Sequence, residues 1–184
     1  MLDLLEKGIL YNGEVLTIVL FGFICDAPAR AFIAYTKTHS GYFSCSKCTE
    51  EGDFEGRIVF LNEKAPLRTD ATFRSQQQDE HHTGRTILEQ LPIDMISTFP
   101  LDYMHLCCLG VMLKLLVAQN FCQEFNDYAK QLLVLFVTEA RAIYGEKFLS
   151  YNVHNLIHLA DDVRHFGNLD SFSAFAFEKL SAGD

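Results

Sequence analysis

The sequence has no hydrophobic run long enough to cross a membrane. Its longest apolar stretch without a charged residue or a histidine, residues 15–25, has eleven residues, about half of the roughly 20 that a membrane-spanning helix needs. We therefore expect a buried strand there and no membrane partner. We also expect no signal peptide, because Met1 is followed by LDLLEKG rather than by a basic segment and an apolar core. Six cysteines without a secretory signal indicate a reducing, intracellular compartment.

Basic residues are scarce. The chain has 15 Lys and Arg against 24 Asp and Glu, which gives a formal net charge of −9. Binding to nucleic acid through counterion release needs clustered Lys and Arg, so we expect this chain by itself to bind DNA weakly or not at all. The acidic balance is compatible with a site for divalent cations, and equally with an ordinary intracellular domain.

The chain does have enough apolar material for one packed domain. Of its 184 residues, 49% are hydrophobic and 16 are phenylalanine, which is typical of a globular fold. Residues 14–25, EVLTIVLFGFIC, favour a central strand covered on both faces, with Asp26 at its carboxyl end. An Ala-rich segment follows at once and predicts a helix that tolerates Pro28 in its first turn.

The middle of the chain is more polar. Residues 41–60 predict a small β-rich element that carries Cys45 and Cys48, and residues 61–86 predict a loop with a short helix. In the HHTG sequence of that loop, we expect His81 and His82 to lie at the surface.

From Asp102 onward the pattern is helical. Residues 103–118 are apolar nearly all round and predict a buried helix with Cys107 and Cys108 in the core. The next helix is predicted to close at Gly145 and to bury one apolar stripe. That stripe consists of Phe121, Phe125, Tyr128, Leu132, Leu135 and Ile143.

Two further helices complete the chain. One is predicted from Asn152, as the N-terminal cap, to a stop at Gly167. The other is predicted from about Ser173 past Glu178. In the LDYMHL sequence, Asp102 and His105 are either functional or simply the start of a helix.

A pair of histidines on the helix after Asn152 has metal-ligand spacing. His154 and His158 are four residues apart, so they lie on one helical face and can ligate one ion. The spacing resembles the zinc-protease motif H-E-x-x-H, but Asn155 stands where the general-base glutamate is required. An amide cannot accept a proton from zinc-bound water, so a protease is excluded.

The C-x-x-C of Cys45 and Cys48 has no second cysteine pair, and the two histidines are its natural complement. Two thiolates and two imidazoles make a closed tetrahedral zinc site of the structural type, although 105 residues separate the two pairs. The plain alternative is a loose pair of thiols and two half-buried histidines. A redox role is less favoured, because acidic and polar residues follow the cysteines without a helix signal.

The two carboxylates Asp26 and Glu178 each have an ordinary interpretation. Asp26 is well placed to cap the helix after it, and Glu178 by itself is a typical solvated helix residue.

In chain order, however, the candidate residues match a known pattern. The blocks CDAPARAF, GYFSCSKC, FPLDYMHLCCLGVM and YNVHNLIHLADDVRHFGNLDSFSAFAFE resemble the catalytic core of cut-and-paste DNA transposases of the CACTA, Mirage and Chapaev group. The likeness is greatest to the transposase domain of animal CACTA-like elements, and more distant to the RAG recombinase core. It runs from about Gly13 to Leu180. Several blocks in the right order are more specific than any single motif.

This resemblance implies a ribonuclease-H-like fold with a zinc-binding, helix-rich insertion, and a DDE set of three carboxylates around two magnesium ions. Asp26 matches the second aspartate and Glu178 the glutamate of that set, so both are implied magnesium ligands and catalytic residues. The implied zinc ligands are Cys45, Cys48, His154 and His158. The resemblance also implies DNA as the partner of the full-length protein, a nuclear location and a homo-oligomer.

One departure bears on activity. The family's first aspartate precedes a β-meander and a helix, whereas only 25 residues precede Asp26 here. At about 3.3 Å per strand residue, three strands and a helix do not fit in that space. We therefore expect a fragment, a decayed copy or a truncated gene model that is inactive alone. The alternative is a non-catalytic, zinc-stabilised interaction module derived from a transposase.

The sequence thus predicts an α+β, mostly helical fold with a partial ribonuclease-H-like core, in a single partial domain over residues 1–184. Its expected parts are a core strand and helix (13–38), a C-x-x-C element with a polar loop (39–100), a helical insertion (101–166) and the start of the closing catalytic helix (167–184).

Overall fold

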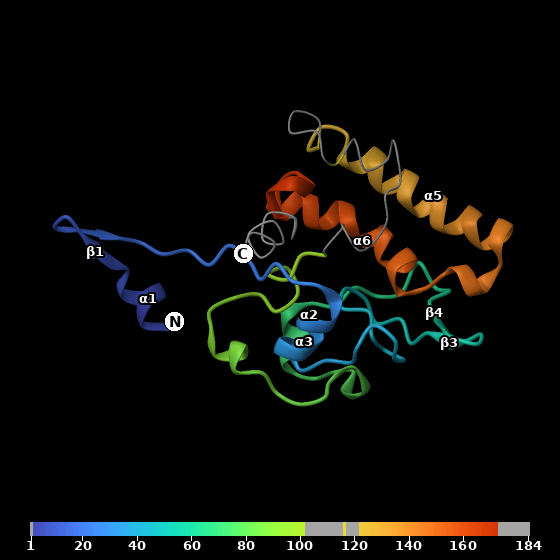
Figure 1. Cartoon of the computed structure of the whole chain (residues 1–184), viewed down its shortest axis with the longest axis horizontal. Coiled ribbons are helices and arrows are strands. Elements are labelled where there is room, and N and C mark those ends of the chain that lie inside the picture. The colour runs from blue at the N-terminus through green and yellow to red at the C-terminus, as the bar shows by residue number, and fades with distance from the viewer. Residues whose placement is uncertain (1, 102–115, 117–121, 173–184) are drawn as a thin grey trace, which may run out of the picture.

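A computed structural model describes residues 2–101, 116 and 122–172 of the chain. This part is mixed α/β and mostly helical, with strands confined to two small hairpins (Figure 1). The helices are α1 (Leu2–Lys7), α2 (Ala27–Ala34), α3 (Asp70–Arg74), α5 (Asn126–Tyr144) and α6 (Tyr151–Phe166). The strands are β1 (Ile9–Tyr11), β2 (Glu14–Leu16), β3 (Asp53–Phe54) and β4 (Ile58–Val59). Short 3-10 turns cover Asp79–His81, Ile87–Gln90, Glu146–Phe148 and Leu169–Phe172.

The prediction of a central strand over residues 14–25 is wrong for the residues after Leu16. Only Glu14–Leu16 forms a strand, and it pairs with β1 as an antiparallel hairpin in the register Ile9↔Leu16. A strand buried on both faces needs sheet neighbours and covering layers, and the described residues supply only two two-stranded sheets. A ribonuclease-H-like sheet is therefore not formed by this part of the chain.

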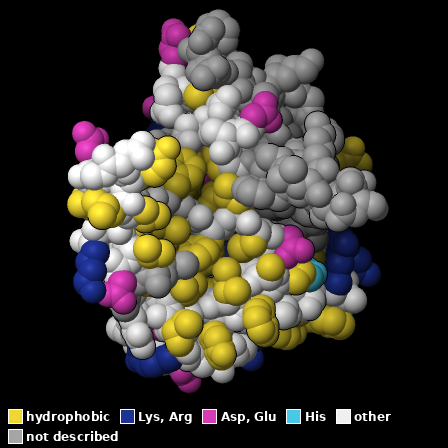
Figure 2. Space-filling model, turned by 60° about the vertical axis from the view of Figure 1, so that its left-hand side comes forward, with side chains coloured by type: hydrophobic (Ala, Val, Ile, Leu, Met, Phe, Trp, Pro, Cys, Tyr) yellow, Lys and Arg dark blue, Asp and Glu magenta, His cyan; other side chains and the backbone are white. Residues whose placement is uncertain are grey.

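The apolar residues after β2 pack on loops and helix ends instead. The Phe23 N–H donates to the Thr98 carbonyl at 2.9 Å, and the Phe21 ring meets Phe166 of α6 edge-on at 5.1 Å. At Gly22 a Cβ would lie 2.9 Å from the Phe166 ring, so a larger residue would push this segment off α6. Several apolar side chains of the N-terminal segment stay exposed, namely Leu4, Ile9, Leu10, Tyr11, Val15, Leu16 and Val19. Figure 2, which brings this side of the molecule forward, shows hydrophobic side chains over much of the described surface.

Helix α2 begins where the sequence predicts. Asp26 is its N-terminal cap and Pro28 lies in its first turn. Downstream, α3 is held by a capping box between Thr69 and Thr72, in agreement with the predicted loop and short helix.

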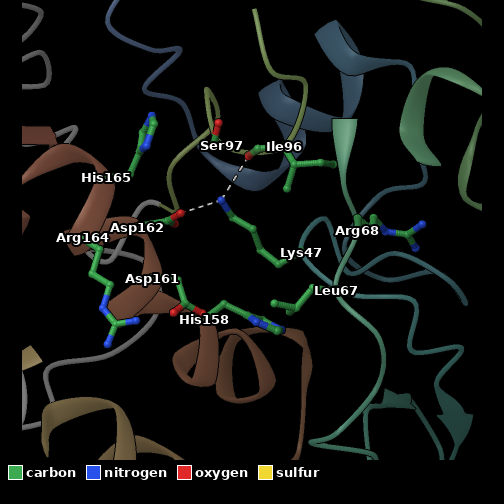
Figure 3. A pocket seen from close by; sticks show the side chains of 10 residues that line it. All are labelled: Lys47, Leu67, Arg68, Ile96, Ser97, His158, Asp161, Asp162, Arg164 and His165. Carbon is green, nitrogen blue, oxygen red and sulfur yellow. Dashed lines mark hydrogen bonds and ion pairs between the residues drawn. The ribbon is translucent and has the colours of Figure 1, made fainter. Parts of the chain in front are cut away.

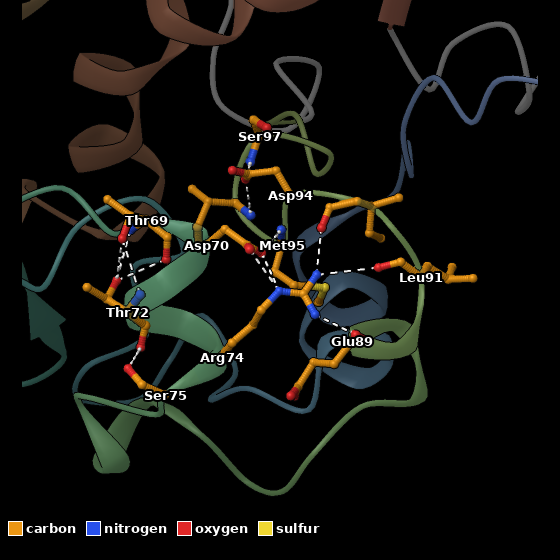
Figure 4. A network of polar contacts seen from close by, with 12 residues as sticks. Thr69, Asp70, Thr72, Arg74, Ser75, Glu89, Leu91, Asp94, Met95 and Ser97 are labelled. Atoms are coloured by element: carbon orange, nitrogen blue, oxygen red, sulfur yellow. Dashed lines mark hydrogen bonds and ion pairs between the residues drawn. The ribbon is translucent and has the colours of Figure 1, made fainter.

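A polar network anchors the loop after α3 (Figure 4). Arg74 forms an ion pair with Asp70 at 2.8 Å and donates to the Ile93 carbonyl at 2.6 Å. Asp70 in turn accepts from the Met95 N–H at 2.9 Å. Residues 93–96 are thereby fixed to α3, which places the Ile96 carbonyl beside the site described below.

Helices α5 and α6 run back along each other and carry the main core (Figure 1). Helix α5 ends at Gly145, as predicted, where a φ of 78° favours glycine. The predicted buried stripe is wrong: Leu135 is 54% exposed and Ile143 69% exposed. The helix is apolar on two sides, and α6 packs on the side with the smaller residues. The buried residues of α5 are Asn126, Ala129, Leu133, Val137 and Ala140.

Helix α6 stops at Gly167, as predicted, but its N-terminal cap position is Ser150 rather than Asn152. The predicted helix from Ser173 lies outside the described residues, and so does the predicted helix over residues 103–118 except for Leu116, which is helical and fully buried. Cys107 and Cys108 also lie outside the described residues. Within the residues that the structure does describe, no helix combines the length and the apolar character needed to span a membrane.

Candidate metal centre

The four predicted zinc ligands meet in space. Cys45 and Cys48 come from the cysteine loop (residues 43–50), and His154 and His158 project from α6. The two Sγ atoms are 3.5 Å apart, and His154 Nε2 lies 3.2 Å from the Sγ of Cys48. His158 Nε2 lies 3.8 Å from the Sγ of Cys45. All four ligand atoms lie within 4.8 Å of one another, and all four residues are buried.

These separations fit one tetrahedral ion. Zinc–sulfur bonds of about 2.3 Å and zinc–nitrogen bonds of about 2.0 Å, at tetrahedral angles, put sulfurs about 3.8 Å apart and sulfur and nitrogen about 3.5 Å apart. A buried Cys₂His₂ cluster is a donor set that suits a structural metal such as zinc. With four protein ligands, no coordination position is left for a catalytic water.

Backbone hydrogen bonds shape the cysteine loop. The Phe43 N–H donates to the Glu51 carbonyl at 2.7 Å, which closes the loop on itself. The Thr49 N–H donates to the Pro66 carbonyl and the Arg68 N–H to the Lys47 carbonyl, both at 2.9 Å. The chain around Cys48 is therefore held against residues 66–68.

Aromatic residues cover the metal centre on a side that the cysteine loop does not enclose. The Phe60 ring lies 5.2 Å from the ring of His154 and 6.2 Å from that of Tyr151. Phe60 is fully buried, and its N–H donates to the Leu149 carbonyl at 2.8 Å. The ligands are thus enclosed between the cysteine loop, α6 and the end of β4.

The two thiols are electrostatically unequal. Burial raises the pKa of the Cys45 thiol, but hydrogen bonds with Cys48, His154 and His158 and the charge of His154 bring this pKa well below its usual value. The hydrogen bond to Cys45, together with burial, raises the pKa of Cys48. A bound divalent cation would favour the thiolate form of both cysteines, because the thiolate is the form that coordinates a metal.

A buried guanidinium lies beside the cysteines. Arg68 is 7% exposed, and its Nε donates to the Cys45 carbonyl at 3.0 Å. Burial lowers the pKa of Arg68, while the nearby Cys45 and Cys48 raise it. Its charge offsets the negative charge on the sulfurs.

Of the two predicted magnesium ligands, Asp26 and Glu178, the structure describes only Asp26. Asp26 is exposed, and its carboxylate accepts a hydrogen bond from the Ala29 N–H at 2.8 Å. It therefore acts as the cap of α2, one of the two roles that the sequence allows. Glu178, Asp102 and His105 lie outside the described residues, so the magnesium pair of Asp26 and Glu178 stays a prediction.

The surface position predicted for His81 is wrong. Its side chain is 1% exposed, and Nδ1 lies 2.6 Å from the Phe43 carbonyl, so Nδ1 carries the proton and donates it. Burial is the main reason that the pKa of His81 is lowered to about 3. His82 is half-buried, with its ring edge-on to Phe73 at 4.7 Å. The polar residues around these histidines gave no sign that they pack inward.

Two residues near the metal centre were not identified by the sequence analysis. Lys47 and Asp162 form a buried ion pair of 2.6 Å at the edge of a cavity of about 330 Å³ that His158 also lines (Figure 3). A signal was present in the sequence: Lys47 stands between the two cysteines, and Asp162 continues the four-residue spacing of the two histidines.

Comparison of the chain with protein-family models, with curated proteins and with solved structures finds no match in any of the three. The metal centre is thus the feature of this chain from which a function can be inferred.

Proposed function

We propose that Cys45, Cys48, His154 and His158 hold one structural zinc ion that joins the cysteine loop to α6. The observation that carries this proposal is the convergence of four buried ligand atoms within 4.8 Å from two distant parts of the chain. Folding brings the two pairs together, so binding free energy becomes folding free energy. The chemistry of the ion here is to fix the fold, because four protein ligands complete its tetrahedral shell.

The wider proposal is that this chain is part of the catalytic region of a DDE-type DNA transposase. Two things support it: the ordered sequence blocks, and the meeting of the zinc ligands that those blocks imply. Of the three carboxylates that two-metal phosphoryl transfer requires, the resemblance assigns only Asp26 and Glu178 here. We therefore expect little or no activity from this chain alone.

A second candidate is a non-catalytic, zinc-stabilised interaction module derived from a transposase. It is favoured by the surroundings of Asp26. This carboxylate caps α2, and the residues before it form no strand after Leu16 in the described structure.

The zinc proposal is tested by metal content. The chain purified under reducing conditions should contain about one zinc ion per molecule by elemental analysis. Cys45→Ser and His158→Ala should lose the metal and melt at a markedly lower temperature, because the remaining ligands cannot fill the shell. Cys25→Ser is the matched control, since Cys25 lies outside the cluster. A folded, zinc-free parent, or ligand variants that melt like it, would refute the metal centre.

The transposase proposal is tested by DNA cleavage. Nicking of duplex DNA with Mg²⁺ is measured for this chain and for a product extended with the coding sequence upstream of Met1. We expect the extended product to nick DNA, and Asp26→Asn and Glu178→Gln to abolish nicking, because both would lose a metal-binding charge. An upstream region interrupted by stop codons, or an inactive extended product, would favour the interaction module.

A further inference from the structure

The ion pair between Lys47 and Asp162 is almost entirely buried. Its Nζ–Oδ1 distance is 2.6 Å, and the two side chains are 8% and 6% exposed. The remaining polar atoms are engaged as well: Lys47 also donates to the Ile96 carbonyl at 3.3 Å, and the second oxygen of Asp162 accepts from the Leu101 N–H at 2.7 Å. Figure 3 shows the Lys47 side chain pointing toward Asp162 of α6 and the Ile96 carbonyl.

Its place in the sequence ties this pair to the metal ligands. Lys47 lies inside the C-x-x-C, directly before Cys48. Asp162 follows His158 by four residues, just as His158 follows His154, so the three side chains form one stripe on α6. The pair therefore joins the same two segments as the proposed zinc ion, one helical turn further along.

A buried ion pair contributes little net stability, because desolvation of the two charges offsets their attraction. The best-attested effect of such pairs is to fix register between packed elements. Here the register in question is that between the cysteine loop and α6. A shift of α6 by one turn would leave only one of the two histidines opposite the sulfurs and would separate Lys47 from Asp162.

We infer that Lys47 and Asp162 are positioning residues for the metal centre: their ion pair holds the two cysteines opposite the two histidines whether or not the metal is bound. This inference rests on the proposed zinc site. Zinc then enters a site whose four ligands are already in place, and the pair raises affinity without touching the ion.

The test measures zinc affinity by competition with a chromophoric chelator, in the whole chain. Lys47→Met and Asp162→Asn should each weaken zinc binding by about 10- to 100-fold, the range typical of groups that orient metal ligands. Asparagine keeps an oxygen that can accept from the Leu101 N–H. The double variant K47M/D162N contains no unpaired buried charge and should fold. It should bind zinc about as weakly as either single variant, because the two residues act as one unit.

A matched control is available one residue away. Asp161 pairs with Lys130 at 2.6 Å, but that pair is about one-third exposed and joins α5 to α6 rather than to the cysteine loop. Lys130→Met and Asp161→Asn should leave zinc affinity roughly unchanged. With cobalt(II) in place of zinc, the ligand-field absorption should shift in the Lys47 and Asp162 variants and not in the controls, because only the former disturb ligand geometry.

The outcomes separate the two proposals. A parent chain that binds no zinc overturns the metal centre and this inference with it. A parent that binds zinc, with the double variant matching it in affinity and cobalt spectrum, overturns the inference alone. Weakened binding in the Lys47 and Asp162 variants, but not in the controls, supports both.

Discussion

His81 supports the metal centre without belonging to it. Its ring donates to the carbonyl of Phe43, the residue at which the cysteine loop begins and which has a left-handed φ of 57°. A non-glycine residue in that region is strained unless its surroundings hold it. His81 is one of the groups that hold it, and only the neutral ring can be buried there without a large desolvation penalty.

The buried His81 should make stability depend on pH. Its pKa is about 3 in the fold, against 6.5 for a free histidine, so the unfolded chain takes up a proton first as the pH falls. The stabilising contribution is therefore complete above about pH 6.5 and decreases toward pH 3. Between pH 7 and 5, the parent should lose about 2 kcal/mol more of unfolding free energy than His81→Asn, which keeps a donor for Phe43 but does not titrate.

The measurement for His81 is urea denaturation of both proteins at pH 7 and pH 5, with zinc content checked at each pH so that metal loss is not mistaken for the histidine effect. Equal pH dependence in the two proteins would contradict a neutral, buried ring.

At the scale of elements, helix α2 offers a way to separate two roles of Asp26. As an N-terminal cap, its carboxylate accepts from the Ala29 N–H. Asp26→Ala should therefore destabilise the protein by about 1 kcal/mol, whereas Asp26→Asn should have little effect, because asparagine caps about as well. Thermal melts measure both. Equal losses for the two variants would mean that the charge of Asp26, rather than its capping oxygen, stabilises this region.

Helix α5 allows a comparison of its two apolar faces. Leu133 is fully buried against α6, and Leu133→Ala should cost about 2–5 kcal/mol through lost contacts and a cavity. Leu135, two residues on, is 54% exposed, and Leu135→Ala should change stability by roughly 0.5 kcal/mol or less. Chemical denaturation of the two variants gives both values. A large loss at Leu135 would show that its face is covered in solution.

Some of these elements could be predicted from the sequence and others could not. The start of α2 at Asp26 and the ends of α5 and α6 at glycines follow from local chain chemistry. The buried face of α5 depends on which of two apolar stripes α6 covers. Residues 17–25 have a strand composition, but they pair with no strand among the residues that the structure describes. Both features depend on tertiary packing, which the periodicity of a sequence alone does not determine.

The residues in and around the metal centre also divide into those that could be predicted from the sequence and those that could not. The ligand types and their spacing identified Cys45 and Cys48 with His154 and His158, because metal coordination demands few residue types in few arrangements. The Lys47–Asp162 pair and the inward His81 were missed, since lysine, aspartate and histidine are common on surfaces and only the packed structure reveals their burial.

For the whole molecule, the proposed zinc ion lies where the N-terminal half meets the α5–α6 pair. Other contacts also cross this junction, among them a hydrogen bond from Arg57 Nε to the Lys147 carbonyl at 2.8 Å. The Phe60 N–H donates to the Leu149 carbonyl, and Lys47 pairs with Asp162. The hydrophobic core of α5 and α6 lies mostly on one side of the junction. Loss of the ion should therefore act first on the junction and less on the helix pair.

Chelation of the metal should loosen the cysteine loop most. We expect hydrogen exchange at the Thr49 and Arg68 amides, which are bonded across the loop, to speed up by at least about tenfold. Amides around Leu133 and Leu159 in the α5–α6 core should change much less. Added zinc should restore protection, because the Lys47–Asp162 pair keeps the ligands near their positions. Unchanged exchange at the loop would mean that the ion has no structural role. A uniform loss of protection would mean that zinc holds the entire fold, and that the ion pair cannot keep the junction formed without it.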